Sequence, residues 1–188
     1  MTLDASTEIE QLAAMVSAKL TAAGITAVLS GGAAVQIYTS GLYVSRDLDF
    51  VSAAGHREIE AVLKGLGFVR QEGRHFDHPS CPYTLEFPPW PVAIGRQVIR
   101  EWGTRAVGPL TIQILTPTQC VMDRLAAFYH WRDRQALDQA VAVASSQDFD
   151  LDAVRRWSNA EGQDERFEEF LRAIQRSSSG SREHDRRS

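Results

Sequence analysis

Cysteine and lysine are scarce in this 188-residue chain, and it contains no long apolar run. The two cysteines, Cys81 and Cys120, lie far apart and form no Cys-x-x-Cys pair, which argues against a disulfide scaffold and favours reduced thiols. Lys19 and Lys64 are the only lysines, so arginine supplies the remaining positive charge. Arginine has a planar donor fork suited to phosphate or carboxylate, although the base composition of a genome produces the same bias.

The charge and hydropathy patterns exclude several classes of protein. No apolar stretch approaches the roughly 20 residues needed to cross a bilayer. The N-terminus, MTLDASTEIEQ, is acidic and polar rather than basic and then apolar, so we expect a cytoplasmic protein without a membrane partner. A net charge of −4 and a pI near 5.7 exclude a global basic field that would hold a polyanion.

The first part of the chain alternates helical and strand patterns. Apolar spacing predicts helices over residues 7–23, 33–38 and 56–66, and strands over residues 25–29, 47–51, 68–70, 83–87 and 110–115. Residues 75–81 are expected to form a loop. This order predicts an α/β (α+β) fold in which a mixed sheet carries helices.

The pattern becomes almost wholly helical after Thr116-Pro117. Helices are predicted over residues 118–131, 133–144, 151–160 and 164–174. The last dozen residues, SSSGSREHDRRS, contain no apolar side chain whose burial could offset the loss of conformational entropy on ordering. We therefore predict a core over residues 1–116, a helical C-terminal section over 117–176 and a disordered tail over 177–188.

Candidate chemistry begins where a strand runs into Ser30-Gly31-Gly32 and continues at Asp47-Leu48-Asp49. Residues two apart in a strand point to the same side, so the two aspartates project together. Adjacent carboxylates are unfavourable unless a cation or solvent relieves them, and oxygen ligands of this kind suit Mg²⁺. A Gly-Gly turn at a helix start lets backbone N–H groups approach an anion. The alternatives are solvated acids on an amphipathic strand and a turn that is only a connector.

A third acid, Glu86, interrupts an otherwise apolar strand between Leu85 and Phe87. Glutamate is disfavoured in strands and expensive to bury unpaired, so this position needs a partner or solvent. A metal ion is one such partner. The alternative is an edge-strand charge that prevents aggregation.

The turn at Gly31-Gly32, the pair Asp47-Leu48-Asp49 and the later strand acid together resemble the nucleotidyltransferase superfamily, which has a GG or GS turn, a DxD or DxE strand and a third carboxylate. The chain is similar in more detail to minimal bacterial nucleotidyltransferase-like proteins, including AbiEii-type toxins. That group has a GGxA turn, an arginine before the acidic strand and a C-terminal helical region. The corresponding segments here are Gly31-Gly32-Ala33-Ala34, Arg46, and Thr116-Pro117 through Asp133-Arg134-Gln135-Ala136-Leu137.

The resemblance implies a nucleotidyltransferase-like core and Mg²⁺-dependent transfer of a nucleotide from an NTP to an RNA end, such as that of tRNA, or to a protein hydroxyl. It assigns the catalytic and metal-binding roles to Asp47, Asp49 and Glu86. The nucleotide-binding residues that it implies are Ser30, Gly31, Gly32, Arg46, Arg124 and Asp133. It also implies a toxin with an antitoxin partner, or a role in phage defence.

Two departures from the family pattern support a different class of function. Ser45-Arg46 directly adjoins Asp47, where the family has a spaced Arg-x-Thr, and Arg124 stands where the helical motif often has a lysine. The second hypothesis is therefore a non-catalytic binding module that acts through a protein partner, which the three retained acids oppose. A third is a metal-independent binder of small molecules.

Other patterns compete with this interpretation. His75, Asp77, His78 and Cys81 could suggest zinc, but the chain has no second pair of ligands at the usual spacing. The aromatic residues within 128–131 could stack on a base, although helical spacing is more typical of core packing, which we expect for Phe128. The arginines within 132–156 could form a basic face for tRNA, but neighbouring aspartates dilute it.

Overall fold

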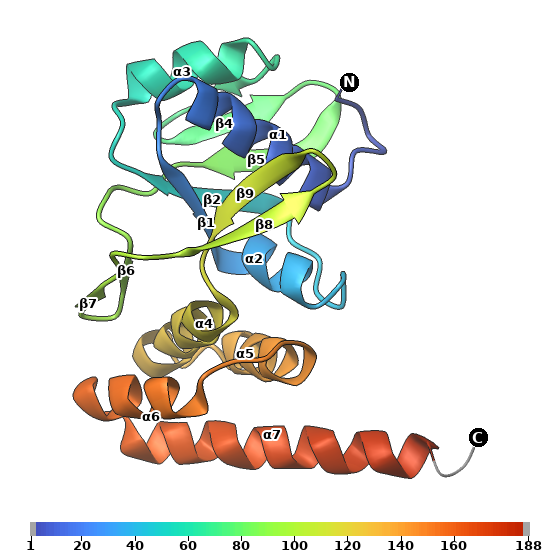
Figure 1. The fold of residues 1–188 in the computed structure, drawn as a ribbon, viewed down its shortest axis with the longest axis vertical. Coiled ribbons are helices and arrows are strands. Elements are labelled where there is room, and N and C mark those ends of the chain that lie inside the picture. The colour runs from blue at the N-terminus through green and yellow to red at the C-terminus, as the bar shows by residue number, and fades with distance from the viewer. Residues whose placement is uncertain (1–2, 186–188) are drawn as a thin grey trace.

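The chain folds into a mixed β-sheet with helices on it and a stack of helices beneath it (Figure 1). The computed structural model describes the backbone of residues 3–185 and the side chains of residues 3–177. Its helices are α1 (Ile9–Ala22), α2 (Gly31–Tyr38), α3 (His56–Lys64), α4 (Pro117–Trp131), α5 (Arg134–Ser146), α6 (Leu151–Ala160) and α7 (Asp164–Asp185). Its strands are β1 (Ala27–Ser30), β2 (Asp47–Ser52), β3 (Val69–Arg70), β4 (His75–His78), β5 (Cys81–Glu86), β6 (Ala93–Ile94), β7 (Gln97–Val98), β8 (Gly103–Val107) and β9 (Leu110–Ile114). The α/β class expected from the sequence is confirmed.

The main sheet has the strand order β3-β4-β5-β2-β1-β9-β8. Strand β1 is antiparallel to β2 and parallel to β9, whereas β2 is parallel to β5. Strands β6 and β7 form a separate hairpin. Apolar side chains of the central strands, including Leu29, Leu48 and Leu85, are fully buried. The acidic strand β2 therefore lies in the middle of the sheet, between β1 and β5.

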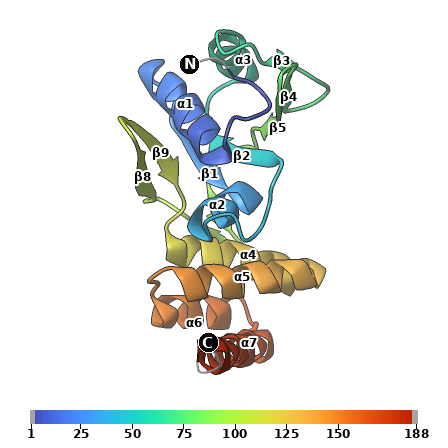
Figure 2. The ribbon, with the colours of Figure 1, turned by 90° about the vertical axis from the view of Figure 1, so that its right-hand side faces the viewer.

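Helix α2 joins the sheet to the helical section. It packs on β1 and β2 and also contacts α4 and α5, and Figure 2 shows it between the sheet and those helices. Helix α4 begins at Pro117, directly after β9, with a capping box in which Thr116 and Gln119 bond each other's backbone N–H groups. The first helix of the C-terminal section thus starts where the sequence predicts it.

Several segments differ from the sequence prediction, among them the short strands β6 and β7, which it did not contain. Residues 75–78 form β4 rather than a loop, because they pair with β5 as one arm of a hairpin. Strand β8 is half exposed along its length and so has little apolar signal. Residues 177–185, expected as a disordered tail, continue α7, and each residue added to a helix that has started contributes one more backbone hydrogen bond. The rest of the predicted tail, residues 186–188, lies outside the described residues.

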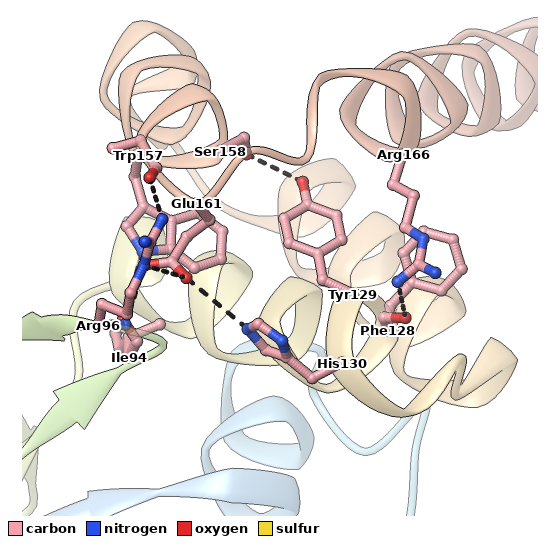
Figure 3. Close-up of polar contacts among 10 residues, drawn as sticks. Ile94, Arg96, Phe128, Tyr129, His130, Trp157, Ser158, Glu161 and Arg166 are labelled. Carbon is pink, nitrogen blue, oxygen red and sulfur yellow. Dashed lines mark hydrogen bonds and ion pairs between the residues drawn. The ribbon is translucent and has the colours of Figure 1, made fainter.

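A buried carboxylate connects the β6-β7 hairpin to the helical section (Figure 3). The side chain of Glu161, just after α6, is 4% exposed, and its Oε2 lies 3.5 Å from Arg96 Nε and 3.7 Å from His130 Nε2. Its Oε1 accepts the backbone N–H of Arg96 at 2.9 Å. Trp157 Nε1 also donates to the Ile94 carbonyl at 3.3 Å. The hairpin tip is therefore held against α4 and α6.

The substitution Gly95→Ala tests this contact. Gly95 has a φ of +57°, and a Cβ there would lie 2.7 Å from Glu161 Cδ. Gly108 has the same φ of +57° but nothing within 4 Å, so Gly108→Ala costs only the left-handed backbone strain, about 1–2 kcal/mol. We expect Gly95→Ala to lower the free energy of unfolding further, because Glu161 must shift, and urea denaturation measures both variants. Equal losses would contradict a tight contact with Glu161.

Candidate active site

Four polar side chains form a row across neighbouring strands of the sheet. In the β-ladder Ser30 lies opposite Asp49, Asp49 beside Glu86, and Glu86 opposite His75. Side chains that are direct cross-strand neighbours share one face of a sheet, and Asp47, two residues before Asp49, shares it as well. The three acids that the sequence singles out therefore lie on one face, at the end of β1 where α2 begins.

Glycine is required at the start of α2. Gly31 has a φ of +65°, and a Cβ there would overlap with Asp49 Oδ2. At Gly32 a Cβ would lie 2.9 Å from the hydroxyl of Ser45, in the segment leading to β2. Ser30 donates its hydroxyl to the Asp49 carbonyl at 3.3 Å instead of capping α2. The turn thus brings the Asp49 carboxylate against the backbone of the first residue of α2.

Asp49 is the electrostatic centre of the site. Burial raises the pKa of its carboxyl to about 6, and the negative charges of Glu86, Asp123 and Asp47 act in the same direction. Arg124 opposes them. The carboxylate of Asp49 therefore has less positive charge around it than its burial requires, so a cation would stabilise it.

Arg124 is the cation that faces Asp49 from the helical section. Its Nη2 and Nε bond to Asp123 Oδ2 at 2.6 and 3.0 Å, and Nη1 lies 3.5 Å from Gln139 Oε1 on α5. Burial opposes the charge of Arg124, but the charge and hydrogen bonds of Asp123, together with smaller contributions that include Asp49, raise the pKa of the guanidinium. The positive charge beside Asp49 is thus fixed in place by its own counter-ion.

Glu86 and Asp47 differ from Asp49 in their surroundings. Glu86 Oε2 lies 3.3 Å from His75 Nε2, and Asp47 is exposed at the start of β2. Within the described residues no group of three His, Cys, Asp or Glu side chains converges enough to hold a metal ion. The donor set nevertheless suits Mg²⁺, because it offers anionic oxygens around an undercompensated carboxylate, and Mg²⁺ often takes its other ligands from substrate phosphates and water. Asp47 and Asp49 are the residues that would hold such an ion.

The remaining predicted residues have other positions. Arg46 has an exposed side chain, and its carbonyl accepts the Thr84 N–H at 2.9 Å, which extends the pairing of β2 with β5. Asp133 is the N-cap of α5 and accepts the Ala136 N–H at 3.2 Å, and the bonds of Arg124 go to Asp123 and Gln139. The phosphate and nucleotide roles of Arg46 and Asp133 stay predictions.

Sequence reasoning missed two residues of the site. Asp123 holds Arg124, and His75 pairs with Glu86. The role of Asp123 could have been predicted from the sequence, because an acid directly next to the candidate Arg124 is a natural counter-ion for it. The sequence places His75 in an expected loop that leads into the Glu86 strand, near the site, and gives no sign of its pairing with Glu86.

The four members of that zinc pattern lie on the β4-β5 hairpin with separate contacts. Asp77 accepts the Thr84 hydroxyl at 2.9 Å, and His78 Nδ1 accepts the Ser80 N–H at 3.1 Å. Cys81 is a buried free thiol. The geometry gives these side chains local roles in the hairpin.

Gly31→Ala tests the close approach to Asp49. Both Gly31 and Gly24 have a positive φ, +65° and +74°, but a Cβ at Gly24 has nothing within 4 Å. Gly24→Ala therefore costs backbone strain alone, whereas Gly31→Ala must also displace the Asp49 carboxylate. We expect a larger loss of thermal stability for Gly31→Ala, together with a shift of the Asp49 pKa in an NMR titration. A Gly31→Ala variant that matches Gly24→Ala in both measurements would refute the contact.

Asp49→Asn tests the raised pKa. An acid whose pKa is about 6 when folded and 3.8 when unfolded destabilises the fold progressively as the pH rises from about 4 to about 6. Asp49→Asn removes this term, so we expect the variant to gain roughly 1–3 kcal/mol relative to the wild type between pH 4 and pH 7. Denaturant unfolding across this pH range gives the difference. Asp47→Asn, at an exposed position, is the control and should change stability by less than about 0.5 kcal/mol.

None of the helices formed by residues 3–185 combines the length and apolar character that crossing a bilayer requires. No protein-family model and no curated protein matches the sequence.

Solved structures share the fold. An antigenic nucleotidyltransferase-like protein from Paracoccidioides brasiliensis matches with 16% identity and a TM-score of 0.56, over 74% of this chain and 77% of that one. ANT(2'')-Ia in complex with adenylyl-2''-tobramycin matches with 14% identity and a TM-score of 0.53, over 81% of this chain and 95% of that one. The antibiotic-resistance factor ANT(2'')-Ia in solution matches with 16% identity and a TM-score of 0.52, over 96% of this chain and 99% of that one. The chain therefore has a nucleotidyltransferase-like fold, and the last match includes the helical section.

Proposed function

We propose that this protein is a Mg²⁺-dependent nucleotidyltransferase that transfers a nucleotide from an NTP to a hydroxyl group. The observation that carries the proposal is the position of Asp49. It lies in one row with Ser30 and Glu86, against the backbone of Gly31, and within electrostatic reach of the half-buried cation Arg124. The nucleotidyltransferase-like fold supports the same activity.

In this reaction the acceptor oxygen bonds to the α-phosphorus of the NTP, and the bond from that phosphorus to the pyrophosphate oxygen breaks. The protein mainly positions groups and supplies charge. Asp47 and Asp49 would hold Mg²⁺, which supplies positive charge to the triphosphate. Arg124 adds charge to the phosphates, and the Gly31-Gly32 backbone lets them approach the start of α2. Glu86, whose Oε2 lies 3.3 Å from His75 Nε2, would accept the proton of the acceptor hydroxyl.

The acceptor is the open part of the proposal. The motif resemblance to AbiEii-type bacterial toxins favours an RNA end, such as that of tRNA, or a protein hydroxyl, in a toxin paired with an antitoxin or active in phage defence. The structure of ANT(2'')-Ia with adenylyl-2''-tobramycin favours instead a hydroxyl of a small polyhydroxylated amine. A cytoplasmic location, which supplies NTP and Mg²⁺, belongs to the same proposal.

A non-catalytic binding module is the second candidate. The 3.3 Å contact of Glu86 Oε2 with His75 Nε2 favours it, because an acid that already has a partner is less available as a third metal ligand. Such a module would keep the fold and bind a protein partner without turnover.

Calorimetric titration with ATP, GTP, CTP and UTP, in Mg²⁺ or in EDTA, tests the proposal. We expect the wild type to bind at least one NTP only with Mg²⁺. The double variant Asp47→Asn/Asp49→Asn should lose this binding, because it removes both metal ligands and leaves the fold intact. A matched control is Asp148→Asn/Asp152→Asn, which changes the same charge at two exposed positions in the helical section.

The outcomes separate the two candidates. Binding that is lost in the Asp47/Asp49 variant and kept in the control supports the carboxylate site, and labelled NTP then identifies the acceptor among RNA, protein and aminoglycosides. Mg²⁺-dependent binding that survives the double variant would contradict the two-carboxylate mechanism. No binding of any NTP would favour the non-catalytic module.

A further inference from the structure

The aromatic side chains at the end of α4 differ sharply in exposure. Phe128 and Tyr129 are buried, 3% and 2% exposed, whereas Trp131 is 78% exposed. Phe128 and Tyr129 therefore belong to the core, as the sequence predicts for Phe128. A single exposed apolar residue is ordinary on a protein surface, so the exposure of Trp131 gains meaning only from what lies near it.

Trp131 shares a face of α4 with Arg124. The two residues are seven positions apart, which in an α-helix is about two turns and roughly 10.5 Å along the axis on the same side. Arg124 lies near enough to Asp49 for the two charges to act on each other, while its guanidinium bonds to Asp123 and Gln139. Ala127 and Phe128 lie between them, one on each side of this line. Phe128 is buried, with Arg134 and Arg166 over its ring, whereas the short side chain of Ala127 leaves the surface low on the other side. Helix α4 thus presents a cation, a small residue and an exposed indole in a line that starts beside the carboxylates.

Contacts on either side of Trp131 fix its place. The ring of His130 lies edge-on to the indole, with ring centroids 6.3 Å apart. On its other side, His130 Nε2 lies 3.7 Å from the buried Glu161 carboxylate, as Figure 3 shows. Arg132 ends the helix in the left-handed conformation, with its N–H bonded to the Phe128 carbonyl at 3.1 Å. Trp131 is therefore the last residue of a regular helix, and the indole projects from the end of α4.

We propose that Trp131 is the stacking platform for the base of the donor nucleotide. This inference rests on the proposed function: the phosphates lie at Arg124 and the carboxylates, the sugar passes over Ala127, and the base stacks on the indole. A nucleotide carries its negative charge on the phosphates at one end and an aromatic base at the other. This face of α4 has the complementary groups in the same order, with Arg124 at one end and the indole of Trp131 at the other. Stacking of this kind accepts any base, so Trp131 supplies affinity for the nucleotide and little selectivity among the four.

The test compares ligands with and without a base. Dissociation constants for Mg²⁺-ATP and for Mg²⁺-tripolyphosphate are measured by calorimetry with the wild type, Trp131→Ala and Trp131→Phe. We expect Trp131→Ala to weaken ATP binding roughly 5- to 150-fold. Tripolyphosphate binding should stay the same, and Trp131→Phe should restore most of the ATP affinity.

A control tryptophan is available at the other end of β2. Trp90 is 41% exposed and packs edge-on against Trp102, and its neighbour Pro89 bridges to Ser52, at the end of β2 away from Asp47. Trp90→Phe should leave ATP affinity unchanged. Fluorescence quenching on ATP addition should be present in the wild type and Trp90→Phe and absent in Trp131→Phe.

The results distinguish the inference from the proposed function. If the wild type binds Mg²⁺-ATP and Trp131→Ala binds it equally well, the stacking role is overturned and the nucleotide site stands. Equal weakening of ATP and tripolyphosphate also overturns it, since the substitution then acts on the phosphates. If the wild type binds neither ligand, the proposed function fails as well, and Trp131 becomes a surface for a protein partner.

Discussion

The close approach of the Asp49 carboxylate to the backbone of Gly31 is the contact on which the rest of the site depends. Antiparallel pairing puts Asp49 opposite Ser30, and the chain turns into α2 at the next residue. Only a residue without a Cβ, at a φ of +65°, leaves room for the carboxylate there. The acid is therefore held where burial penalises its charge, which raises its pKa and creates a need for positive charge nearby.

Helix α2 transmits this arrangement to the helical section. It begins at the carboxylate and contacts both α4 and α5, so the same element that shapes the site also carries the helix with Arg124. On the far side the β6-β7 hairpin reaches α4 and α6 through Glu161. The two attachments fix α4 under the sheet at both flanks. A cation on α4 can then face Asp49 without a direct ion pair, because its counter-ion is Asp123 on its own helix.

The sequence predicted the parts of the site that depend on local pattern. Alternation in residues 47–51 identified two aspartates on one face, and the glycine pair marked the turn, because both signals lie within a few residues. The pairing of His75 with Glu86 depends on a hairpin whose first strand, β4, is mostly polar, so no periodicity revealed it. The exposure of Trp131 depends on which face of α4 is covered by other helices. Helical spacing alone could not separate it from Phe128, three residues earlier.

The charges of the site determine which form of a nucleotide can bind there. Asp47, Asp49 and Glu86 share one face, and Arg124 is already bonded to Asp123, so the group as a whole is anionic. A free triphosphate would meet this negative charge and be repelled. A free cation would find two carboxylates and too few further ligands to complete its shell. When the cation and the triphosphate bind together, the phosphate oxygens complete the coordination shell of the cation. The cation in turn reduces the repulsion between the phosphates and the three acids. The geometry therefore favours a metal-nucleotide complex over either component alone.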